Sequence, residues 1–168
     1  GINQNLNALW FRILGDTSAQ SVCWLASVVA VTVLLALAVR ANLPGRGNTA
    51  TDRELLLSVT LAVAVWGLLV SPTSWGHHWT WGVVATLVAA ILALRADDGL
   101  RFGAYGLLAI VGAVVFAIGP YQLLPTDTAY WSPVEQVIGN AYILWGVAFL
   151  VVVWLLPCRR TPAPDADD

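Results

Sequence analysis

The sequence contains no lysine and no methionine, and only 11% of its 168 residues are charged. Soluble domains carry roughly 25% charged residues, so this composition is not that of a chain surrounded by water alone. The net charge of −2 and the lack of a basic patch argue against a nucleic-acid partner. Because the chain opens on Gly1 without an initiator methionine, we expect it to be the C-terminal part of a longer protein.

Cysteine and histidine are also scarce, with two residues of each. Cys23 and Cys158 give no disulfide framework, and they are predicted to lie at opposite membrane faces. Zinc sites need three or four ligands, and adjacent histidines on a helix point about 100° apart. We therefore predict no metal site and no cofactor. A metal-binding membrane sensor would need ligands from outside this sequence.

Long apolar runs dominate what is present. A membrane helix needs about 20 mainly apolar residues. Five runs qualify, at residues 22–39, 55–70, 79–94, 102–119 and 137–156. The expected fold is therefore all-α, a polytopic membrane helix bundle of about five transmembrane helices. Capping-box patterns at Thr51–Glu54 and Ser132–Glu135 predict where the second and fifth helices begin.

The positions of the arginines predict the orientation of the bundle, because cytoplasmic loops carry excess Lys and Arg. Seven of the eight arginines fall in three alternate regions, namely Arg40, Arg46 and Arg53, then Arg95 and Arg101, then Arg159 and Arg160. This pattern predicts a plasma-membrane protein with a cytoplasmic C-terminus and an extracytoplasmic loop at residues 71–79. Residues 1–157 form the membrane part, and residues 158–168, rich in Pro and Asp, are predicted to be a disordered cytoplasmic tail.

The N-terminal segment has a helical pattern of its own. Its apolar residues recur at helical spacing, with polar residues elsewhere on the wheel: Ile2, Leu6, Leu9, Trp10, Ile13 and Leu14. This pattern predicts an amphipathic helix that lies along the outer membrane interface. A helix packed on the bundle explains the pattern equally well.

The loop "SPTSWGHHW", Ser71–Trp79, holds both histidines of the chain. On a helix, Trp75 and Trp79 would share a face, and an indole face suits the CH surface of a sugar. An imidazole can donate to a phosphate oxygen or relay a proton, and the N-terminus of a following helix would favour an anion. The alternative is that these residues only decorate the membrane interface.

These residues resemble a known family. SPTSWGHHW is similar to the "SP-x-SW-x-HHW" signature of the actinobacterial polyprenol-phosphate-mannose-dependent α-mannosyltransferases, membrane enzymes of the GT-C fold. The opening Asn3-Gln4-Asn5-Leu6 resembles the "NQSL" segment upstream of that signature, with Asn5 where Ser is more common. The resemblance covers nearly the whole chain, as the C-terminal part of such an enzyme.

The resemblance implies transfer of mannose from a polyprenyl-phosphate-mannose donor to a glycolipid acceptor at the outer face of the plasma membrane. The acceptor would be of the phosphatidylinositol mannoside or lipomannan type, with an α-1,2 link. The catalytic carboxylate would precede Gly1, since Asp16 and Asp127 do not match its motif. The candidate site residues are His77 and His78 as catalytic residues, with Asn3, Gln4, Arg12, Ser71, Ser74, Trp75 and Trp79 as substrate-binding residues. Arg12 is included because it is the only arginine predicted to lie on the outer side, and the others belong to the two motifs.

Two sets of residues keep alternative interpretations. Tyr121, Gln122, Tyr130 and Trp131 could line an acceptor groove or form an aromatic belt at the membrane interface. Arg12 could contact a phosphate or anchor a lipid headgroup. The alternative for the whole chain is a non-enzymatic transporter or scaffold subunit, although the predicted spans hold few polar residues beyond Ser and Thr.

Overall fold

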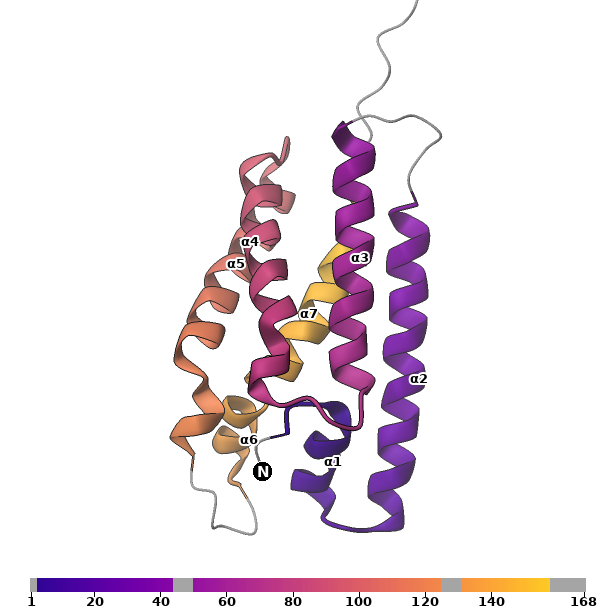
Figure 1. Cartoon of the computed structure of the whole chain (residues 1–168), viewed down its shortest axis with the longest axis vertical. Coiled ribbons are helices and arrows are strands. Elements are labelled where there is room, and N and C mark those ends of the chain that lie inside the picture. Colours follow the sequence, from indigo (N-terminus) through magenta and orange to yellow (C-terminus); the bar gives the residue numbers. More distant parts are fainter. Residues whose placement is uncertain (1–2, 44–49, 125–130, 158–168) are drawn as a thin grey trace, which may run out of the picture.

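The computed structural model describes residues 3–43, 50–124 and 131–157, which form a bundle of helices (Figure 1). The all-α prediction is confirmed, since the only β pairing among these residues is one isolated bridge. Tyr130, Asp127 and the predicted tail lie outside the described residues. The elements are α1 (Leu6–Leu14), α2 (Ser18–Ala41), α3 (Ala50–Val70), the 3-10 turn η1 (Gly76–Trp79), α4 (Thr80–Leu94), α5 (Gly99–Ile118), the 3-10 turn η2 (Pro120–Leu123), α6 (Pro133–Gly139) and α7 (Ala141–Leu155).

Among the described residues, four segments are long and apolar enough to cross a membrane: Ser18–Ala41, Arg53–Val70, Gly76–Leu94 and Gly99–Ile118. The pair α6 and α7 makes a fifth candidate, bent by 65° at its break. Large apolar side chains on the outside of α2, such as Val22, Leu25 and Val29, are more than half exposed within the bundle. A helix that is apolar on all sides suits lipid better than water. Four of the predicted spans are therefore confirmed by length and composition, and the bent pair α6 and α7 makes five if it is counted as one span.

Two details of the predicted helices are wrong. The fifth run is not one helix, because it breaks at Asn140, whose side-chain amide donates to the backbone oxygen of Gln136 at 2.7 Å. Thr51 does not cap α3, since that helix already includes Ala50. The Ser132 capping box is confirmed: the Ser132 N–H donates to Glu135 Oε2 at 2.7 Å, and Glu135 N–H donates to Ser132 Oγ at 3.4 Å.

Small residues allow α4, α5 and α7 to approach closely. A side chain at Gly82 would overlap the ring of Phe116, and one at Gly112 would overlap Thr86 and Trp145. Close backbone approach through small residues is a common way for helices to pack in membranes. These contacts hold the last three long helices together beneath the His-containing loop.

The bundle has two distinct ends (Figure 1). One end gathers α1, the α3–η1 connection, η2 and α6, and the other gathers the end of α2, the start of α3, the α4–α5 turn and the end of α7. Arg12 lies at the first end. The second end carries Arg40, Arg53, Arg95 and Arg101, and there Arg95 pairs with Glu54. The arginines of the described segments are therefore separated as the sequence predicts.

Helix α1 packs on the bundle. Leu6 is buried, and the Trp10 indole N–H donates to Ser27 Oγ of α2 at 3.1 Å. Phe11 and Ile13, in contrast, are exposed. The amphipathic helix is confirmed and it contacts the bundle, whereas its position at a membrane interface stays a prediction.

Candidate functional site

The His-containing loop begins with a serine-rich connection after α3. Ser74 is buried, and its hydroxyl donates to the backbone oxygen of Leu68 at 2.7 Å, which turns the chain back over the end of α3. Ser71 Oγ donates to the backbone oxygen of Thr73 at 3.0 Å. Both serines therefore shape the loop from within, and a contact between either serine and a substrate stays a prediction.

The N-terminal segment runs antiparallel along this connection, with a bridge between Asn3 and Trp75. The Asn3 amide donates to the Pro72 oxygen at 3.0 Å and accepts from the Ser74 N–H at 2.7 Å. The Gln4 N–H donates to the Ser74 oxygen at 2.6 Å. The structure thus joins the two motifs that the sequence singled out, although about 70 residues separate them.

Asn5 adds a third connection that the sequence interpretation missed. Its Oδ1 accepts from the Ala8 N–H at 2.8 Å and caps α1, while its Nδ2 donates to the Ser71 oxygen at 2.6 Å. Asparagine is a favoured N-cap, so its place just before an amphipathic run was a usable signal. A serine at this position could form the cap, but it has no amide group to donate to Ser71.

Trp79 and Gln4 are buried next to the exposed residues of the His-containing loop. The Trp79 side chain is only 1% exposed and contacts the rings of Phe116 and Tyr142. Gln4 is fully buried, and its side-chain amide has no hydrogen-bond partner among the described residues. The expectation that Trp75 and Trp79 share a helix face is wrong, because Trp75 is extended and a 3-10 turn follows it.

The rings of Trp75, His77 and His78 contact one another, and all three residues are exposed. The Trp75 and His78 rings are nearly parallel, at 3° with centroids 6.1 Å apart. The His77 ring meets both of them edge-on, with its centroid 5.5 Å from that of Trp75 and 4.3 Å from that of His78. The Trp75 N–H donates to His78 Nδ1 at 3.2 Å, and anion binding at the start of the following helix stays a prediction.

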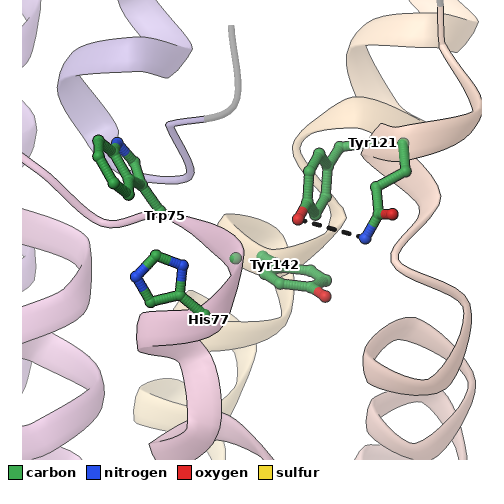
Figure 2. Close-up of a pocket in the computed structure, with 6 residues that line it drawn as sticks. Trp75, His77, Tyr121 and Tyr142 are labelled. Carbon is green, nitrogen blue, oxygen red and sulfur yellow. Dashed lines mark hydrogen bonds between the residues drawn. The ribbon is translucent and has the colours of Figure 1, made fainter.

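A pocket of about 430 Å³ opens beside His77 (Figure 2). Two of its walls come from η2 and α7, and its lining consists of Trp75, Gly76, His77, Tyr121, Gln122 and Tyr142. For Tyr121 and Gln122 the sequence left open an acceptor groove or an aromatic belt, and the structure places both in the lining of the pocket with His77. Tyr142 was missed, because nothing in the sequence separates it from the other residues of a long apolar run.

The Tyr121 hydroxyl lies directly against Gly76. A Cβ atom at position 76 would overlap this hydroxyl, so a glycine is required for the observed arrangement. Tyr121 also contacts Tyr142, with ring centroids 5.4 Å apart at an angle of 84°. The width of the pocket therefore depends on glycine at position 76, which has no Cβ atom to push Tyr121 away.

Arg12 connects three segments near the pocket. Its guanidinium donates to the Asn3 backbone oxygen at 2.8 Å and to Asn140 Oδ1, and it lies 5.1 Å from the centre of the Trp131 ring. Burial lowers the pKa of Arg12 to about 10, which leaves it charged at neutral pH. Arg12 therefore joins the N-terminal segment to the break between α6 and α7. Contact between Arg12 and a phosphate stays a prediction.

A second hollow lies along the membrane-spanning helices. It has a volume of about 450 Å³, is formed by α5, α6 and α7, and is lined by apolar residues that include Leu107, Val111 and Leu144. On α7, Tyr142 lines the pocket beside His77, and its near neighbours Ala141 and Trp145 line this second hollow. One helix therefore carries residues of both cavities. No group of three metal-ligating side chains occurs in the described ranges.

The chain is similar to curated mycobacterial proteins. It is 33% identical over 99% of its length to the polyprenol-phosphate-mannose-dependent α-(1-2)-phosphatidylinositol mannoside mannosyltransferase of Mycolicibacterium smegmatis. It is 39% identical over 61% of its length to the Mycobacterium tuberculosis protein of the same name. It is also 31% identical, over 91% of its length, to a pentamannoside mannosyltransferase of M. tuberculosis.

The chain spans only part of these relatives, with 37%, 23% and 32% of their respective lengths covered. No family profile matches the chain, and no solved structure is significantly similar to it. The family resemblance predicted from the two motifs is confirmed. With its apolar helices, the chain is a membrane protein, homologous over nearly its whole length to part of the polyprenol-phosphate-mannose-dependent α-(1-2)-phosphatidylinositol mannoside mannosyltransferases.

Proposed function

We propose that this chain forms the His-containing part of a membrane mannosyltransferase. The enzyme transfers mannose from a polyprenyl-phosphate-mannose donor to a phosphatidylinositol mannoside acceptor. The observation that carries this proposal is the meeting of the two family motifs at one pocket, where the Asn3 segment holds the loop that presents His77. The names of the relatives supply the donor and acceptor classes.

The pocket offers groups that suit a sugar joined to a phosphate. The Trp75 indole is half exposed and presents an apolar face for the CH groups of a hexose. The His77 imidazole can donate to the departing phosphate, where negative charge develops as the sugar–oxygen bond breaks. Tyr121 and Gln122 add hydroxyl and amide groups that can bind sugar hydroxyls.

The reaction exchanges one bond at the anomeric carbon for another. The acceptor hydroxyl oxygen attacks that carbon, the bond to the phosphate oxygen breaks with its electron pair, and the phosphate leaves. The acceptor proton passes to a general base. The six described residues that line the pocket include no carboxylate. We therefore propose that the base is a carboxylate other than these six residues.

We further propose that the His-containing end faces outward and that the C-terminus is cytoplasmic. The support comes from the arginines Arg40, Arg53, Arg95 and Arg101, which lie at or near the opposite end of the bundle. Positive residues favour the cytoplasmic side. A lipid-linked donor at the outer face would then reach the pocket from the adjacent membrane leaflet.

The experiment is mannose transfer by the full-length enzyme reconstituted in lipid vesicles. Labelled polyprenyl-phosphate-mannose and a phosphatidylinositol mannoside acceptor should give a mannosylated lipid that is sensitive to α-1,2-mannosidase. GDP-mannose in place of the lipid donor should give none. Transfer from GDP-mannose, or no transfer from the lipid donor by a well-folded enzyme, would contradict the proposal.

A further inference from the structure

The two adjacent histidines occupy different positions in the loop. His77 lines the pocket, and Figure 2 shows its ring beside the Trp75 indole. His78 is not among the residues that line the pocket. The His78 Nδ1 instead accepts a hydrogen bond from the backbone N–H of Trp75 at 3.2 Å. The backbone N–H of His78 donates to the backbone oxygen of Trp75 at 2.9 Å.

We propose that His78 is a positioning residue and that His77 alone carries the imidazole chemistry of the pocket. His78 closes the turn through two reciprocal hydrogen bonds with Trp75. The bond from the Trp75 N–H to Nδ1 matches one half of a capping box, in which the third helical residue, usually Glu or Gln, accepts the N-cap N–H, and the other bond is the backbone bond of the 3-10 turn. This inference rests on the proposed function for its activity test, but not for its structural test.

The ring contact strengthens the same connection. The His78 imidazole lies parallel to the Trp75 indole, with the two centroids 6.1 Å apart. Trp75 is bound on its other side by the Asn3 bridge. The backbone of Trp75 is therefore held between the N-terminal segment and His78, and the next two residues, Gly76 and His77, form the edge of the pocket.

The hydrogen bond also determines the tautomer of His78. A nitrogen that accepts an N–H bond carries no proton, so neutral His78 must hold its proton on Nε2. Protonation of Nδ1 would break the bond to the Trp75 N–H. The positioning role therefore requires neutral His78, whereas a catalytic role in the pocket would require an imidazole that reaches the substrate.

Four variants of the full-length enzyme separate the two roles. Glutamine at position 78 keeps an acceptor for the Trp75 N–H but removes the imidazole, whereas leucine removes both. We expect His78→Leu to lower kcat/KM about fivefold or more, the factor that corresponds to the cost of a lost cap, about 1 kcal/mol, and His78→Gln to recover most of that loss. At position 77, Gln and Leu should both abolish most turnover.

The outcomes are decisive for the activity test. Equal activity of His78→Gln and His78→Leu at equal expression would overturn the inference, because a hydrogen-bond acceptor at position 78 would then contribute nothing to activity. High activity of His77→Gln would overturn it as well. If the wild-type enzyme transfers no mannose, the proposed function fails, and the positioning role is judged by the structural test alone.

The structural test reads the tautomer of His78 directly. The full-length protein is labelled with ¹⁵N-histidine in lipid bilayers at about pH 8, above the range in which a free imidazole titrates. The His78 signals are assigned by their loss in His78→Gln. We expect an unprotonated Nδ1 and a protonated Nε2. A protonated Nδ1 in the neutral ring would refute the hydrogen bond and the positioning role with it.

Discussion

The indole N–H of Trp79 donates to the backbone oxygen of Gln4 at 3.0 Å, although 75 residues separate them in the sequence. Trp79 begins the third membrane-spanning run, and Gln4 belongs to the N-terminal segment. This bond lies beneath the His-containing loop, and both residues are buried. It therefore fixes the N-terminal motif to the bundle at the site.

Trp79→Phe should destabilise the protein by about 1–3 kcal/mol. The variant leaves the Gln4 oxygen buried without its donor, which costs about that much, and it also removes packed volume. Thermal unfolding of the purified protein in detergent measures the change. Trp81→Phe is the matched control, because Trp81 lies two residues further along, in α4, and is 52% exposed. Equal shifts in the two variants would contradict the role of the hydrogen bond.

Arg12→Lys should also destabilise the protein, by about 1–2 kcal/mol, because an ammonium group cannot make the forked contacts of a guanidinium. The double variant with Asn140→Ala should lose less than the sum of the single losses, since both changes break the same contact. Additive losses, measured by thermal unfolding, would show that the two side chains act separately.

The pH dependence of the Arg12 effect follows from its pKa. Burial lowers the pKa to about 10, so the charged form is disfavoured in the folded protein. That cost is present in full at any pH well below 10 and fades only as the pH rises through and above this value. The stability difference between wild type and Arg12→Met should therefore be the same at about pH 6 and pH 8. A difference that changes between these pH values would contradict this account of Arg12.

Gly76→Ala should reduce mannose transfer by displacing the Tyr121 hydroxyl from the pocket. Tyr121→Ala removes the overlapping atoms, so Gly76→Ala should have little additional effect in that background. The four enzymes of this cycle are compared by kcat/KM at equal expression. An equal loss from Gly76→Ala with and without Tyr121 would show that the two residues do not meet.

The helices of this protein could be predicted from the sequence more completely than its site could. The lengths of the apolar runs were enough to identify all five candidate spans. A sufficiently long apolar helix is stable in lipid whatever its neighbours are. The break at Asn140 escaped prediction, since a single polar residue in an apolar run does not by itself end a helix. Its amide bonds to Gln136 and to Arg12 exist only after the distant segments have met.

In the site, the sequence identified the right segments but not the direction of each side chain. Helical spacing placed Trp75 and Trp79 on one face, whereas the 3-10 turn sends Trp79 into the core and leaves Trp75 exposed. The same local geometry separates His77 from His78. Tyr142 joined the pocket through tertiary packing of α7, which no local pattern records.

The proposed orientation predicts where two introduced cysteines will react. Cysteine at Thr73, in the exposed part of the His-containing loop, should react in intact cells with a reagent that does not cross membranes. Cysteine at Asp97, in the exposed α4–α5 turn, should react only after lysis. Both are made with the native Cys23 and Cys158 replaced by serine. The reverse labelling pattern would invert the proposed topology.

The most direct test of the central claim is the turnover number of His77→Leu in the full-length enzyme. The claim is that mannose transfer takes place at the pocket beside His77. Leucine removes the N–H donor that glutamine would keep. We expect kcat to fall at least about a hundredfold, since one donor to a developing negative charge contributes about 10²–10³ in rate, with expression and thermal stability close to wild type. Unchanged transfer by a stable His77→Leu enzyme would contradict the account.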